Sequence, residues 1–196
     1  MLEHILICNK CSLCCNQKPT LDIENSDAIF WVGLSAKKSS KMLGPLSSET
    51  NTGRIIQMIE KDIPNMVTYK TNLVKCPPLN ERGKLRYPTN AEIQTCIKNL
   101  DDEIKSLTPK IVFLLGEKVS LAVANYYQEH FEKWRGYKYY YTDIGGCYFI
   151  PIQHPSYIYI YKKRDVQEYI SGIRDVIRRV LEVQKNSDEE GKYEFE

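Results

Sequence analysis

The chain has 196 residues, 42% of them hydrophobic and 27% charged, which is enough for one well-buried domain. No stretch approaches the ~20 consecutive apolar residues of a membrane-spanning helix, and the first four residues lack the basic flank and apolar run of a signal peptide. We therefore expect a cytoplasmic protein without membrane contact, whereas the net charge of +2 argues neither for nor against nucleic acid.

Cysteine is concentrated at the start of the chain, where the first fifteen residues hold four of the seven: Cys8, Cys11, Cys14 and Cys15. An odd count in a reducing compartment disfavours a disulfide framework, so metal ligation is the leading hypothesis. The spacing of Cys8 and Cys11 lets two thiolates reach one metal centre, which Cys76 and Cys96 could complete. Scattered thiolates favour an iron–sulfur cluster slightly over zinc. Cys14 is a rival ligand, and unliganded buried cysteines are the third alternative.

Apolar runs and helical spacings alternate through the first half of the chain. A buried strand is predicted over 28–33, because the run is short and rich in aromatic and branched residues. Isoleucines at helical spacing predict a helix over 52–63 that Pro64 closes. A second strand, over 67–74, is stopped by Pro77 and Pro78. The following loop carries Arg82, Lys84 and Arg86, as a phosphate contact or as a solvated surface.

The same alternation continues in the second half. Thr89 and Glu92 have capping-box spacing and start a helix that Pro109 ends. A strand apolar on both faces, over 111–115, leads directly into a helix over 117–131. A ribbon of 139–142 and 147–152 leads into His154, and the last helix is predicted over 165–183. The acidic segment 184–196, with a charge of −3, is expected to be a disordered tail behind a single domain over 1–183.

Tyrosine and isoleucine alternate over 157–161, ahead of three basic residues. An amphipathic edge strand with a basic end is one interpretation. In the other, the loop after His154 enters the DNA minor groove, an apolar side chain fills the gap left by a flipped base, and the basic triplet holds phosphates. The candidate DNA-binding residues of this segment are Ser156, Tyr157, Ile158, Lys162, Lys163 and Arg164.

Strands that alternate with helices predict an α/β fold, a three-layer αβα sandwich around a central, mostly parallel four-stranded sheet. Ligands of such sheets lie beyond the carboxyl ends of the strands. In this chain those ends are 33–37, 72–76, Gly116 and His154, so the functional side chains should converge there.

Several segments together resemble the uracil-DNA glycosylase superfamily, specifically its iron–sulfur branches, family 4 and family 5. The resemblance covers residues 8 to about 180, and the Asn-x-Val-Lys-Cys-x-Pro segment with a downstream Glu-x-x-x-Cys is its specific signal. The matching stretches, in the family's order, are Cys8-x-x-Cys11-x-Leu13, Val32-Gly33-Leu34-Ser35-Ala36, Thr71-Asn72-Leu73-Val74-Lys75-Cys76-Pro77-Pro78, Tyr87-Pro88, Glu92-Ile93, Cys96, Pro109-Lys110-Ile111-Val112, Leu115-Gly116 and His154-Pro155-Ser156-Tyr157.

The resemblance implies a role for each matched position. Cys8, Cys11, Cys76 and Cys96 would hold a structural [4Fe–4S] cluster near the DNA. The amide of Asn72 is suited to read the uracil edge, because it offers both a donor and an acceptor. His154 lies where the family places the histidine that meets the anion forming on the departing base. The base-binding set is Asn72, Gly33, Leu34, Ser35 and Leu46.

The sequence departs from family 4 at Leu34, where that family carries a glutamate, and follows family 5 there. A second family 5 segment resembles residues 45–49 and has an aspartate at the place of Glu49, so Glu49 is the candidate catalytic carboxylate. The stacking phenylalanine of the family falls on Leu46. Both changes leave room for a deaminated or modified base other than uracil.

The expected function is a monofunctional DNA glycosylase of the base excision repair type, which acts as a monomer on single- or double-stranded DNA. It is expected to be monofunctional because no lysine is placed for Schiff-base chemistry. One alternative is a weak or inactive module of the same fold that binds uracil-containing or single-stranded DNA. The other is a zinc-bearing nucleic-acid protein of unrelated activity.

Overall fold

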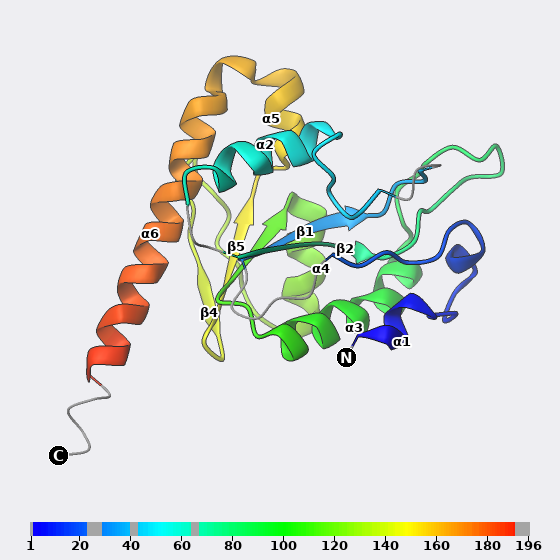
Figure 1. The fold of residues 1–196 in the computed structure, drawn as a ribbon, viewed down its shortest axis with the longest axis horizontal. Helices are drawn as coiled ribbons and strands as arrows, with labels where there is room; N and C mark the ends of the chain where they lie inside the picture. Colours follow the sequence, from blue (N-terminus) through cyan, green and yellow to red (C-terminus); the bar gives the residue numbers. More distant parts are fainter. Residues whose placement is uncertain (1, 23–28, 40–42, 64–66, 191–196) are drawn as a thin grey trace.

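The computed structural model describes residues 2–22, 29–39, 43–63 and 67–190. A five-stranded sheet in the order β2-β1-β3-β5-β4 forms its centre, with helices on both faces (Figure 1). The parallel strands are β1 (Ile29–Ser35), β2 (Thr68–Val74), β3 (Ile111–Leu115) and β5 (Cys147–Ile152). The predicted sandwich is confirmed, but the predicted count of four strands is one too low.

The additional strand is β4 (Thr142–Ile144), which pairs antiparallel with β5 at the sheet edge. The turn between them contains Gly145 and Gly146, both with positive φ, a conformation that glycine adopts without steric penalty. The ribbon was expected at this place, but its first arm lies later than predicted. Since a three-residue strand carries almost no periodic signal, its position could not be read from the sequence.

Side chains of alternating strand residues divide the core in two, because successive residues of a strand point to opposite faces. Ile29 and Trp31 of β1 pack with α2 (Asn51–Glu60), α5 (Pro155–Tyr161) and α6 (Val166–Glu190). Phe30 and Val32 pack on the other face, with α1 (Glu3–Leu6), α3 (Asn90–Leu107) and α4 (Glu117–Tyr127). The two faces give the three layers seen in Figure 1.

Most helix ends follow the expected chemistry. Thr89 and Glu92 form the predicted capping box of α3. The helix α4 ends at Tyr127, earlier than predicted, where Gln128 takes the left-handed conformation. The helix α6 continues to Glu190, beyond the predicted end. Among the described helices none is both long and apolar enough to cross a membrane. Ala28, Pro64 and the tail segment 191–196 lie outside the described residues.

The tyrosine-rich segment 157–161 is helical, so the interpretation as an edge strand is wrong. Pro155 occupies the first turn of α5, where its missing N–H is not needed, and the His154 side chain caps the helix by accepting from the backbone N–H of Ser156. Two short 3-10 turns, at Ser12–Cys15 and Lys163–Asp165, complete the secondary structure that is described.

Candidate functional site

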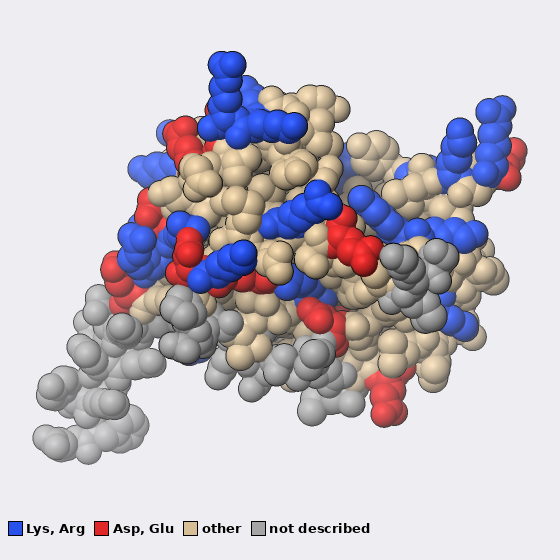
Figure 2. All heavy atoms as spheres, turned by 45° about the horizontal axis from the view of Figure 1, so that its top comes forward, with Lys and Arg blue, Asp and Glu red and all other residues tan. Residues whose placement is uncertain are grey.

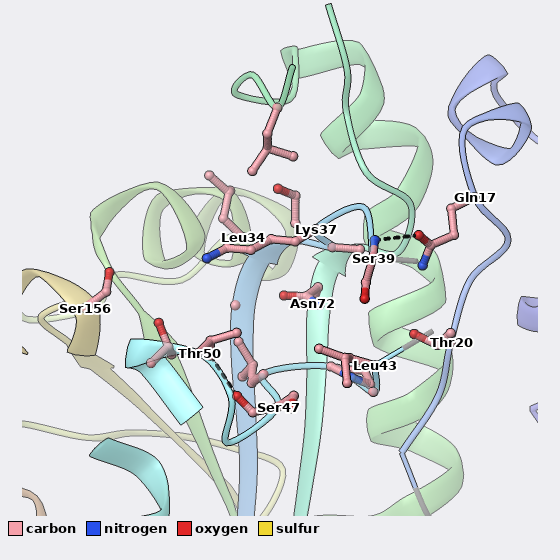
Figure 3. A pocket seen from close by; sticks show the side chains of 18 of the residues that line it. Gln17, Thr20, Leu34, Lys37, Ser39, Leu43, Ser47, Thr50, Asn72 and Ser156 are labelled. Carbon is pink, nitrogen blue, oxygen red and sulfur yellow. Dashed lines mark hydrogen bonds between the residues drawn. The ribbon is translucent and has the colours of Figure 1, made fainter. Parts of the chain in front are cut away.

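A cavity of about 390 Å³ opens at the carboxyl ends of β1, β2 and β5, where the alternation of strands and helices predicts a ligand. Most of the predicted base-binding and catalytic residues line it: Gly33, Leu34, Ser35, Leu46, Asn72 and His154. Segments far apart in the sequence, from residue 17 to residue 156, contribute side chains to its walls (Figure 3).

Asn72 lies at the end of β2, opposite Gly33 in the neighbouring strand, and is only 6% exposed. A Cβ atom at position 33 would come within 2.5 Å of the Asn72 Oδ1 atom and within 2.9 Å of Leu46 Cδ2. Glycine is therefore required for the close approach of the amide and of Leu46. The Asn72 amide has no hydrogen-bond partner among the described residues, so both its donor and its acceptor are available to a ligand.

His154 follows β5 and lines the same cavity, so the strand ends bring together two residues that lie 82 positions apart, 154 minus 72. Its Nδ1 atom accepts the backbone N–H of Ser156 at 3.3 Å and the Ser156 hydroxyl at 2.8 Å. Burial, together with the charge of Lys37, lowers the pKa of His154 to about 4. The ring is then neutral near pH 7, and the backbone N–H at Nδ1 assigns its proton to Nε2.

Glu49, the candidate catalytic carboxylate, does not line the cavity. Its side chain is exposed, and its backbone N–H donates to the Ser47 hydroxyl at 3.3 Å. The described lining holds no carboxylate at all, and its charged members are the cations Lys37 and Arg86. The assignment of Glu49 rested on a loop match, and a match of this kind does not reveal which way a side chain turns.

Several lining residues are not among the predicted site residues, because each lies in a loop without a periodic pattern: Gln17, Thr20, Lys37, Ser47, Thr50 and Tyr87. Gln17 and Thr20 come from the cysteine-rich segment, and the Gln17 side chain accepts the Ser39 N–H at 3.1 Å (Figure 3). The N-terminal segment therefore supplies part of the cavity wall. Some of them still have a signal in the sequence: Tyr87 belongs to the matching stretch Tyr87-Pro88, Lys37 lies in the strand-end range 33–37, and Gln17 lies close to the cysteines.

A second, small cavity has five cysteines in its lining: Cys8, Cys11, Cys14, Cys76 and Cys96. Cys15 is exposed and lies outside it, and Cys147 lies on the far side of the fold, against Phe149. All four predicted ligands are thus together, and the rival ligand Cys14 lines the same cavity. Burial, followed by the neighbouring Cys96, raises the pKa of the Cys76 thiol to about 12, so binding of a metal there would release protons.

The donors around this cavity fit thiolate ligands. The Lys75 N–H donates to Cys96 Sγ at 3.3 Å, and the Asn99 amide reaches both Cys8 Sγ, at 3.8 Å, and Cys96 Sγ, at 3.7 Å. No group of three His, Cys, Asp or Glu side chains in the described residues is arranged for a single ion. A zinc ion needs sulfurs roughly 3.8 Å apart, given Zn–S bonds of about 2.3 Å. The cavity is lined by enough cysteines to supply the four thiolates that a four-iron cluster takes.

The candidate DNA-binding residues after His154 divide into two groups. Tyr157 and the basic triplet 162–164 are exposed, and Figure 2 shows lysine and arginine side chains standing out over this region. Ile158 is 1% exposed and packs in the core, so its assignment to the DNA surface is wrong. Because α5 is a helix and not a strand, Ile160 instead of Ile158 faces outward, at 50% exposure. Ser156 lines the cavity and bonds to His154.

Comparisons with known proteins agree with this geometry. A model of the family described as the uracil DNA glycosylase superfamily matches residues 13–177. The chain is 24% identical over 170 residues to the type-4 uracil-DNA glycosylase of Sulfurisphaera tokodaii, a match that covers 84% of this chain and 68% of that protein. The crystal structure of wild-type Pedobacter heparinus SMUG2 has a TM-score of 0.50 at 13% identity, over 81% of this chain and 77% of that one, which supports the fold.

Proposed function

The chain belongs to the uracil DNA glycosylase superfamily, and from this premise we propose that it hydrolyses the bond between the sugar and a uracil, or a related deaminated or modified base, in DNA. The observation that carries the proposal is the pairing of Asn72 and His154 in one cavity. An enzyme of this kind must flip the base out of the stack and read it in a pocket. The cavity lies where such a pocket is expected.

In the proposed mechanism Asn72 reads the base. Its amide N–H donates to a carbonyl oxygen and its carbonyl accepts the imide N–H, so the pair of contacts selects a uracil-type edge. Gly33 leaves the room for this amide, and Leu34, Ser35 and Leu46 enclose the base. Leu46 supplies apolar contact without an aromatic face, which permits bases of altered shape.

His154 stabilises the leaving group. Negative charge builds on the base oxygen as the glycosidic bond breaks, and the neutral ring donates through its Nε2–H. A donor placed at a developing oxyanion contributes roughly 10²–10³ in rate. With no carboxylate in the described lining, stabilisation of the departing anion carries more of the catalysis than stabilisation of the sugar cation does.

A [4Fe–4S] cluster held by Cys8, Cys11, Cys76 and Cys96 is part of the proposal, supported by the place of these cysteines in the lining of one cavity. Its contribution would be structural, because it would tie the N-terminal segment to β2 and α3. The same segment carries Gln17 and Thr20 into the base cavity.

The experiment is an incubation of the protein with labelled oligonucleotides that carry uracil, hypoxanthine, xanthine or hydroxymethyluracil, followed by alkali. Excision leaves an abasic site, and alkali then breaks the strand. We expect breakage with at least one of these bases. Intact strands throughout, with retained binding, would instead favour the second candidate, a binding module of the same fold. The lack of a carboxylate in the described lining is the observation that favours that candidate.

We also propose that the enzyme is monofunctional. Lys37 is the one lysine in the described lining, and its side chain is exposed. Reduction with borohydride during the reaction traps a Schiff base between a lysine and the abasic sugar. We expect no trapped complex and no strand break before alkali; a trapped complex that disappears in Lys37→Arg would contradict the monofunctional assignment.

A further inference from the structure

The loop between β2 and α3 forms a second wall at the mouth of the cavity. Leu85, Arg86 and Tyr87 of this loop line the same cavity as His154 and Ser156. In Figure 1 the loop projects well beyond the sheet, next to the segment that follows β1. A nucleic acid strand that places a base on Asn72 would therefore pass beside it.

The projecting loop is built to hold its shape. Leu79 and Leu85 form an isolated bridge, the Asn80 N–H donates to the Lys84 carbonyl at 2.8 Å, and Gly83 takes a positive φ of 68°. The Asn80 side chain accepts the N–H groups of Arg82 and Lys84, both at 3.0 Å. These bonds fix a tight turn with two exposed basic side chains at its tip.

Arg86 is 33% exposed in its side chain, and its hydrogen bonds go to partners within the chain. Its guanidinium donates two hydrogen bonds to Glu92, at 2.8 and 2.6 Å, and one to the Tyr87 carbonyl, at 2.9 Å. The Arg86 guanidinium holds the pKa of Glu92 at about 2, so the ion pair persists at neutral pH. Arg86 therefore anchors Tyr87 to the start of α3 and is not available as a phosphate contact.

Tyr87 is held in place but is not buried. Its side chain is 69% exposed, and Leu85 beside it is 47% exposed. The Lys118 ammonium of α4 lies 3.9 Å from the centroid of the tyrosine ring, within the range of a cation–π contact. The ring is held by its backbone and by a cation, yet it faces solvent at the cavity mouth. Because its side chain is already ordered, a stacking partner would cost it little further conformational entropy.

We propose that Tyr87 stacks on the nucleobase next to the flipped one in single-stranded DNA, while Arg82, Lys84 and Lys118 lie along the phosphates. This inference rests on the proposed function and adds a strand preference to it. Aromatic side chains stack on unpaired bases of any sequence, whereas in a duplex the neighbours of a flipped base stay paired with the opposite strand and held within the helix. The ring therefore favours single-stranded substrate.

The test measures binding of the full-length protein to a short oligonucleotide that contains one 2′-fluorinated deoxyuridine, which resists cleavage, as a single strand and as a duplex. Tyr87→Ala should weaken single-strand binding by about tenfold, while Tyr87→Phe keeps the ring and the affinity. Duplex binding by Tyr87→Ala should fall by no more than about twofold. Leu121→Ala, an exposed residue of α4 outside the cavity, is the matched control.

Unchanged single-strand binding by Tyr87→Ala would overturn the inference, as would an equal loss on the duplex, which would make Tyr87 a wedge. A second measurement uses only the wild-type protein, so it does not depend on whether a variant folds. The fluorescence of 2-aminopurine placed beside the uracil should be quenched when wild-type protein binds the single strand; no change on either side of the uracil contradicts stacking. Both readouts use binding, so they remain decisive if the wild type excises no base, the outcome that would contradict the proposed function itself.

Discussion

The protonation state of His154 decides what this residue can do in the cavity. Two Ser156 donors occupy Nδ1, and burial keeps the ring neutral, so Nε2 carries the proton that a departing base needs. A charged imidazolium would also donate, but it would first have to be stabilised against desolvation and the nearby Lys37 charge. The neutral donor is available without that penalty near pH 7.

The same shift makes the free energy of unfolding depend on pH. The pKa of His154 is about 4 in the folded chain and 6.5 in the unfolded one, so the unfolded chain binds more protons between these values. The stability contributed by the neutral ring is complete above about pH 6.5 and is lost as the pH falls toward 4. At pH 5 we expect the wild type to have lost about 2 kcal/mol that His154→Gln does not lose. Urea unfolding at pH 7 and pH 5 measures the free energy of unfolding of the wild type and of His154→Gln. Equal losses in the two proteins would contradict the lowered pKa of His154.

Glu49 is the predicted catalytic residue that the structure leaves outside the cavity lining. The carboxylate is exposed and outside the cavity lining. We therefore expect Glu49→Gln to change the single-turnover excision rate by less than about threefold, because a solvated carboxylate outside the site makes no contact with the reacting atoms. Glu129→Gln, also exposed, is the control. A loss of about 100-fold specific to Glu49→Gln would return the catalytic role to this residue.

The residues that could be predicted from the sequence lie at strand ends. Asn72 lies near the carboxyl end of β2 and His154 lies just beyond β5, so the parallel topology brings them to one edge of the sheet. Lys37, Gln17 and Tyr87 lie in loops, where no periodicity reports the direction of a side chain.

At the scale of elements, a buried ion pair joins β2 to α3. The Lys75 ammonium bonds to Glu103 and to the Thr71 hydroxyl, the latter at 2.6 Å, and Tyr69 donates to Glu103 at 3.1 Å. The two charged side chains are 1% and 0% exposed. Since β2 carries Asn72 and leads to Cys76, and α3 carries Cys96, this pair fixes the strand that supplies both proposed sites.

Removal of one partner leaves an uncompensated buried charge. We expect Glu103→Ala to lower the free energy of unfolding by about 3–5 kcal/mol. Lys133→Ala breaks an ion pair whose side chains are more than 60% exposed, and should cost less than about 1 kcal/mol. Denaturant unfolding of both variants compares them directly, and similar small losses would show that the buried pair is not needed to hold β2 on α3.

Most elements follow from apolar runs and caps; besides the short strand β4, the clearest failure is the segment after His154. The alternation of Tyr and Ile over 157–161 fits a strand, yet the segment is the helix α5. Pro155 and the His154 cap favour a helix only at its first turn. The segment is so short that its hydrophobic periodicity cannot distinguish a helix from a strand. The helix also places Ile158 in the core, whereas the interpretation as a DNA-binding loop places it at the DNA surface.

At the scale of the whole molecule, the N-terminal segment links the two cavities. It holds Cys8 and Cys11 at one and Gln17 and Thr20 at the other. If the proposed cluster is bound there, its oxidative removal in the presence of a chelator should raise amide hydrogen exchange over 8–20 and reduce excision.

The helix α4, which contributes no residue to the cysteine cavity, is the internal control for this exchange experiment. Its exchange should stay unchanged while that of the N-terminal segment rises. Unchanged hydrogen exchange over 8–20 would show that the cluster is not what orders this segment. The absence of iron in protein isolated without oxygen would contradict the cluster itself.

The central claim is that Asn72 and His154 act on the same base. The most direct measurement is the single-turnover excision rate of a uracil oligonucleotide by the wild type, Asn72→Ala, His154→Ala and the double variant. We expect each single variant to be slower by roughly 10²–10³, and the double variant to be less impaired than the product of the two losses, because both residues serve one transition state. Excision that survives both substitutions within a few-fold would contradict the account.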